Sequence, residues 1–124
     1  MGYESRLYVV EKRLVRDEEG RRFSSVIAMF DLSKCYFLSG ELRNRPVANC
    51  YFYADDFNTK VTKDRYGQPL TETTVEDVVR ILEEAIRSGA DYRYISPLLS
   101  FMKGLDSQMK NGIWGEVAVL HFGY

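Results

Sequence analysis

The segment TTVEDVVRILEEAIRSG, residues 73–89, decides the fold, because strand-like sequence precedes it and helical periodicity begins within it. Thr73 or Thr74 can cap a helix, with an acidic residue three positions later in a capping-box pattern. Apolar side chains then recur at helical spacing, at Val75, Val78, Val79, Leu82, Ala85 and Ile86. Gly89 provides a stop. We therefore predict a helix over residues 74–88 with one buried stripe.

A second helix is predicted downstream, over residues 96–109. Ser96 can cap it, and Pro97 suits its first turn. Its apolar positions also recur at helical spacing, and the pair Asn111-Gly112 ends it. Together the two helices give the predicted core residues: Val79, Leu82, Ile86, Leu98, Leu99, Phe101, Met102 and Leu105.

The sequence before residue 73 is rich in β-branched and aromatic residues separated by polar turns, which is typical of strands. Strands are predicted over residues 6–15, 22–32, 48–54 and 59–63, and a last one over 116–122. Residues 33–47 form a connection with a short helix or turn. We therefore predict one α+β domain spanning residues 1–124. Its mostly antiparallel sheet has the order of four strands, two helices and a final strand, with both helices packed on one face.

Charge and hydropathy exclude two classes of partner. The net charge is −1 and the pI is about 5.9, whereas proteins that bind duplex DNA carry a strong basic excess. The longest apolar runs fall well short of the roughly 20 residues that a membrane helix needs. The first residues also lack a hydrophobic targeting core. We therefore expect a cytoplasmic protein that binds neither duplex DNA nor a membrane.

The sequence contains no complete catalytic or metal-binding motif. His121 is the sole histidine, and the two cysteines, Cys35 and Cys50, lie far from it along the chain. Zinc sites need three or four ligands, usually at tight spacing, so no metal and no cofactor is expected. With no signal peptide, the two cysteines are predicted to stay reduced as small core residues.

Aromatic and arginine side chains gather around two turns, one helix start and a glycine-flanked tryptophan. Aromatic faces stack on bases, and guanidinium groups grip phosphates. Arg65 and Arg93 are the predicted phosphate contacts. The full set of candidate ligand-binding residues is Asn58, Arg65, Tyr66, Arg93, Tyr94 and Trp114. The alternative interpretation is ordinary packing, with tyrosines at sheet edges and their hydroxyls in water.

Several segments spread along the chain resemble small accessory proteins of phages and prophages of Gram-positive bacteria. They are residues 5–12 (SRLYVVEK), 27–32 (IAMFDL), 53–59 (YADDFNT), 64–67 (DRYG) and 119–124 (VLHFGY). None is a catalytic signature, so the resemblance indicates where the gene resides more than what its product does. It implies a protein of the infected host cell that counters host immunity. Thoeris-type nucleotide sponges and anti-CRISPR proteins are two such mechanisms.

Three functions follow from these observations. The first is a non-enzymatic anti-defence protein that sequesters a cyclic nucleotide or a cyclic ADP-ribose isomer in a pocket between subunits of a homo-oligomer. The second is a protein-binding inhibitor of a host defence effector, such as an anti-CRISPR. The third is a nuclease or hydrolase built on carboxylates from Asp55, Asp56 and Asp64.

Overall fold

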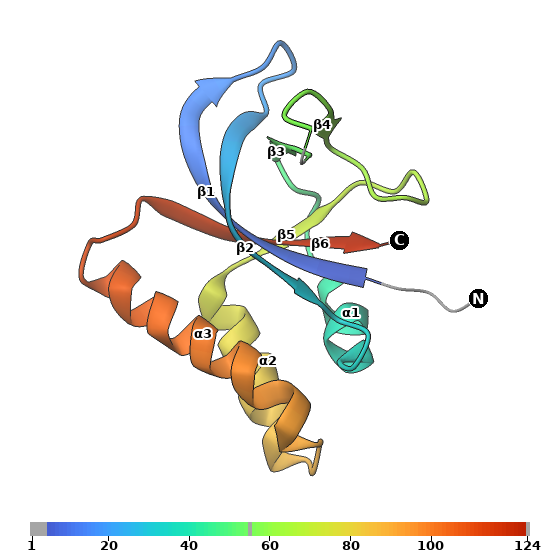
Figure 1. The fold of residues 1–124 in the computed structure, drawn as a ribbon, viewed down its shortest axis with the longest axis vertical. Coiled ribbons are helices and arrows are strands. Elements are labelled where there is room, and N and C mark those ends of the chain that lie inside the picture. The colour runs from blue at the N-terminus through green and yellow to red at the C-terminus, as the bar shows by residue number, and fades with distance from the viewer. Residues whose placement is uncertain (1–4, 55, 124) are drawn as a thin grey trace.

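A computed structural model describes residues 5–54 and 56–123 as a curled sheet with helices on one side (Figure 1). Its elements, in chain order, are β1 (Ser5–Arg16), β2 (Arg22–Asp31), α1 (Tyr36–Leu42), β3 (Cys50–Tyr53), β4 (Lys60–Val61), β5 (Thr71–Thr73), α2 (Val75–Arg87), α3 (Tyr92–Lys110) and β6 (Glu116–Gly123). The α+β class is confirmed, and the strands predicted over residues 6–15 and 22–32 pair antiparallel as β1 and β2. The described part of the chain contains three helices where two were predicted, and the extra strand β5 precedes α2.

The prediction of a mostly antiparallel sheet is wrong, because the sheet is mixed. Its strand order is β4-β3-β2-β1-β6-β5. Strand β1 lies in the middle and pairs antiparallel with both β2 and β6. Strand β3 runs parallel to β2, over the short register Arg22↔Cys50 and Phe23↔Tyr51. The chain returns through α1 before it enters β3, and such a crossover gives a parallel pair where a hairpin would give an antiparallel one.

Both predicted helices form, but the second starts earlier than predicted. The Thr74 hydroxyl caps α2 by accepting a hydrogen bond from the Asp77 amide at 3.0 Å. Helix α3 begins at Tyr92, because the Asp91 side chain caps it by accepting the Arg93 amide at 3.0 Å. Pro97 therefore lies in the second turn, where it removes one intrahelical hydrogen bond.

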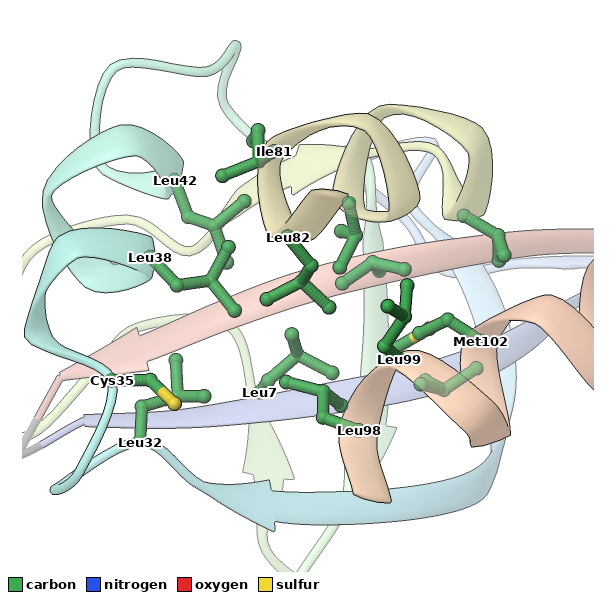
Figure 2. Close-up of a cluster of buried hydrophobic side chains, with 14 of the residues drawn as sticks. Leu7, Leu32, Cys35, Leu38, Leu42, Ile81, Leu82, Leu98, Leu99 and Met102 are labelled. Atoms are coloured by element: carbon green, nitrogen blue, oxygen red, sulfur yellow. The ribbon is translucent and has the colours of Figure 1, made fainter. Parts of the chain in front are cut away.

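Side chains from all three helices pack on one face of the sheet. Figure 2 shows Leu7 of β1 between Leu82 of α2 and Leu98 of α3. Five of the predicted core residues are buried, namely Leu82, Leu98, Leu99, Met102 and Leu105. The other three, Val79, Ile86 and Phe101, are partly buried against the same cluster. Helix packing on one face is thus confirmed, with α1 added.

The opposite face of β1 and β6 carries a second, smaller core. Val10 and Leu120 are fully buried there beneath Phe52 of β3 and Leu70, which precedes β5. Because successive strand residues point to opposite faces, β1 and β6 bury side chains on both sides. The curl of the sheet places β3 and β4 over this second face.

Candidate functional site

Arg93, Tyr94 and Trp114 lie at opposite ends of α3. Arg93 and Tyr94 are in the first turn, and Trp114 follows the last. A helix of 19 residues is about 28 Å long, so one small ligand cannot contact both ends. The Arg93 guanidinium pairs with Asp91 at 2.8 Å, which lowers the pKa of Asp91, and the Trp114 indole donates to Gln108 at 2.8 Å. These groups therefore already have local partners.

Asn58, Arg65 and Tyr66 lie in two different turns. The backbone amide of Asn58 donates to the Asp56 carboxylate at 2.9 Å in the β3–β4 loop. This bond and those from Thr59 lower the pKa of Asp56 to about 2, with the Thr59 hydroxyl contributing most. Arg65 and Tyr66 belong to the β4–β5 turn, where the Arg65 amide donates to the Gly123 carbonyl at 2.9 Å. The six predicted residues are thus not assembled into one site, and their role in binding stays a prediction.

The structure contains instead a cleft of about 740 Å³ on the face of the sheet away from the helices. We call it the aromatic cleft, after the six aromatic side chains that line it: Tyr8, Phe23, Phe52, Tyr53, Phe57 and Phe122. The Tyr8 ring lies 4.6 Å from Phe52 and 6.0 Å from Phe122, centroid to centroid. Tyr8, Phe52 and Phe122 thus form one group of neighbouring rings, and none of the six aromatic lining residues is in the candidate list above.

The cleft exists because β2 and β3 diverge. Their parallel pairing ends at Phe23↔Tyr51, and β2 continues to Asp31 along β1 alone within the described chain. The second half of β2 therefore forms one wall, and β3 with its following loop forms the other. Val26 and Met29 of β2 face this space and remain 42% and 48% exposed. These two apolar side chains of the strand predicted over residues 22–32 are thus left open to solvent.

Ion pairs centred on Asp17 connect β4, beside the second wall, to the β1–β2 turn. Lys60 of β4 pairs with Asp17 in the β1–β2 turn at 3.0 Å and lies 4.4 Å from the centre of the Tyr51 ring. Asp17 also accepts from Arg21 at 2.9 Å. Burial alone would raise the pKa of Asp17, but the Arg21 amide, Lys60 and the Arg21 guanidinium together hold it well below its usual range.

The rim of the cleft combines one cation with one prominent ring. The Arg6 guanidinium lies 3.5 Å from the Tyr8 hydroxyl, and Ser24 and Ser25 are further polar lining residues. Phe57 is 83% exposed and has a φ of 58°, a left-handed conformation that is rare for an aromatic residue. Its amide donates to the Ala54 carbonyl at 2.8 Å, which fixes the turn that presents the ring.

A second pocket, of about 380 Å³, lies on the helix side of β6. We call it the basic pocket; its polar lining residues are Arg43, Arg45, Asp64, Tyr66, Gln68, Thr71 and His121. His121 is 5% exposed, and its Nε2 is the one buried side-chain nitrogen or oxygen without a hydrogen-bond partner in the described chain. Burial, assisted by the Arg43 charge and opposed by Asp64, lowers the pKa of His121 to about 4.

Carboxylates and thiols do not gather at either pocket. Across residues 5–54 and 56–123, no group of three or more His, Cys, Asp or Glu side chains is arranged to hold a metal. Cys35 and Cys50 are free and buried. Of the three predicted hydrolase carboxylates, Asp56 and Asp64 lie in separate turns and Asp55 is outside the described residues. None of the three described helices is long and apolar enough to cross a membrane.

Comparisons with protein-family models, with curated proteins and with solved structures find no match for this chain.

Proposed function

We propose that the protein reversibly binds a small, planar aromatic ligand of nucleotide type in the aromatic cleft. The observation that carries the proposal is the run of six aromatic side chains around one cleft of about 740 Å³. Small-molecule sites usually occupy about 300–1,000 Å³ and combine apolar walls with a few polar groups. The cleft has both properties.

The chemistry of the lining favours a base and a phosphate. Stacking of a base on an aromatic side chain contributes about 1–3 kcal/mol. Tyr8 and Phe122 form the floor, and Phe57 stands at the rim, where it can cover a bound ring. Arg6 offers a permanently charged fork for a phosphate. With the resemblance to phage accessory proteins, these features favour a nucleotide-derived immune signal, which tight binding alone would silence.

The experiment is calorimetry against cyclic dinucleotides, cyclic trinucleotides and cyclic ADP-ribose isomers, followed by chromatography of the ligand released by heat. We expect one class to bind and to be recovered intact. Phe57→Ala should weaken binding about 5- to 100-fold through the lost stacking. Tyr92→Ala, which removes a 59% exposed ring on α3, is the matched control.

Two results would count against this proposal. One is an equal effect of Phe57→Ala and Tyr92→Ala, which would remove the cleft as the binding site. The other is a cleaved product, which would revive the hydrolase hypothesis. Ligand affinity is also measured for Arg6→Ala and for Arg93→Ala. The first variant tests the cation of the cleft, and the second tests the phosphate contact predicted from sequence.

A protein-binding inhibitor is the second candidate, and a specific observation favours it. Beyond Phe23, β2 pairs with β1 alone in the described chain, so one edge of β2 is open beside exposed Val26 and Met29. An extended peptide could add to that edge and insert side chains into the cleft. This candidate would be favoured if no nucleotide binds and if the protein captures a host protein that the Val26→Lys variant no longer captures.

A further inference from the structure

The basic pocket lies apart from the aromatic cleft, on the opposite face of β6. His121 belongs to the face that carries Val117 and Val119 toward the helices, whereas the next residue, Phe122, lines the cleft. The pocket forms where the chain leaving α1 meets β5, β6 and the β4–β5 turn. Strand pairing places His121 between Leu7 of β1 and Thr71 of β5. Its position is therefore fixed on both sides by the sheet.

His121 is the feature that needs an explanation. A side chain that is 5% exposed normally has its polar atoms hydrogen-bonded, yet Nε2 has no partner among the described residues. An unpaired buried nitrogen costs free energy in the folded state. The lowered pKa of His121 keeps the imidazole neutral at pH 7, so it can act there as a hydrogen-bonding group. A ligand that supplies the missing partner would recover the lost free energy.

The charges around His121 favour an anion as that ligand. Arg43 lines the pocket and is close enough to lower the pKa of His121. Arg45 is fixed beside it by a two-point pair with Asp77, at 2.7 and 3.2 Å. Asp64 is the one carboxylate of the lining, and its oxygen already accepts the amides of Tyr66 and Gln68 at 2.9 and 3.0 Å.

We propose that the basic pocket binds a small oxyanion of the phosphate or carboxylate class. Arg43 supplies the charge, and His121 donates a hydrogen bond from the nitrogen that lacks a partner. Because Nε2 is shielded from solvent, the imidazole ring must turn about its Cβ–Cγ bond as the anion enters. A bound anion favours the imidazolium, so binding strengthens as the pH falls from 7 toward 5.

The single histidine of the sequence makes a direct test available. In ¹⁵N-labelled protein, every imidazole nitrogen signal reports on His121. Inorganic phosphate and acetate are titrated separately at pH 7 in a chloride buffer of constant ionic strength. We expect saturable shifts of the His121 signals with at least one anion. The dissociation constants for phosphate and acetate then show which oxyanion is preferred.

Two arginine variants locate the site. Arg43→Gln should weaken binding about tenfold or more, because a charged hydrogen bond is lost. Arg16→Gln removes an exposed guanidinium at the end of β1, which lines neither pocket and donates to the Gly20 carbonyl at 2.7 Å, and should leave binding unchanged. Circular dichroism checks that both variants fold.

Either of two outcomes overturns the proposal. One is no movement of the His121 signals, or a shift that grows with concentration without saturating, which identifies an adventitious ion only. The other is equal weakening by both arginine variants. Neither outcome bears on the aromatic cleft, because the nucleotide experiments test Phe57 and Arg6, which line the cleft and not the basic pocket.

Discussion

Lowering the pH from 7 to 5 should destabilise the protein through His121, by about 2 kcal/mol. Burial lowers the pKa of this histidine from 6.5 to about 4 in the folded chain. Well above pH 6.5 both states are neutral, and the residue contributes no pH dependence. Between pH 6.5 and 4 the unfolded state binds the proton first, so the free energy of unfolding falls as the pH falls. At pH 5 the two pKa values give a difference of about 2 kcal/mol, which rises to about 3 kcal/mol below pH 4.

The assay is urea unfolding at several pH values in a buffer without phosphate, with His121→Gln as the control. The glutamine keeps a polar side chain but does not titrate. Wild type should lose roughly 1–2 M in its urea midpoint between pH 7 and 5, and the variant should change little. Asp77 does not interfere, because Arg45 lowers its pKa from 3.8, so its stabilisation is lost only as the pH falls below about 4. Equal pH dependence in both proteins would refute this account of His121.

Three further predictions concern the core and the caps. Leu82→Ala should cost about 2–5 kcal/mol in urea unfolding, because Leu82 is fully buried on the core face of α2; a loss below about half a kcal/mol would show that another face of α2 is buried. Thr74→Ala should cost about 1 kcal/mol by removing the cap on the Asp77 amide, whereas Thr74→Ser should retain most of it. Burial raises the pKa of Cys35 and of Cys50, so a thiol reagent should react far more slowly with native than with denatured protein; equal rates would contradict the buried placement.

The features that the sequence predicts well depend on neighbours along the chain. Helix α2 is marked at its start by the Thr74 cap and at its end by Gly89, whose φ of 93° suits a helix stop. The start of α3 shows the limit of such rules. Asp91 and Ser96 are both good caps, and Pro97 favours the later start. The helix nevertheless begins at the earlier cap, where the Asp91 carboxylate accepts a hydrogen bond from the Arg93 backbone amide.

Features set by distant segments were not predictable from local pattern. The parallel pairing of β2 with β3 depends on where α1 delivers the chain. The aromatic cleft depends on those strands separating after Phe23, a property that no single strand encodes. Tyr8 and Phe122 read as ordinary alternating strand residues, although they form the floor of the cleft. An excess of aromatic residues on the non-helix face of two paired strands is the signal that would have indicated them.

The two pockets have opposite requirements, which bears on what one chain could bind. The aromatic cleft leaves Val26, Met29 and Phe57 in water, so any planar ligand there gains apolar burial without moving the core. The basic pocket instead contains a buried nitrogen, Nε2 of His121, that lacks a partner and would need a hydrogen-bonding ligand. Both pockets meet at β6, through the consecutive residues His121 and Phe122. Successive strand residues point to opposite faces, so one strand contributes to two separate pockets, and each pocket can be tested without disturbing the lining of the other.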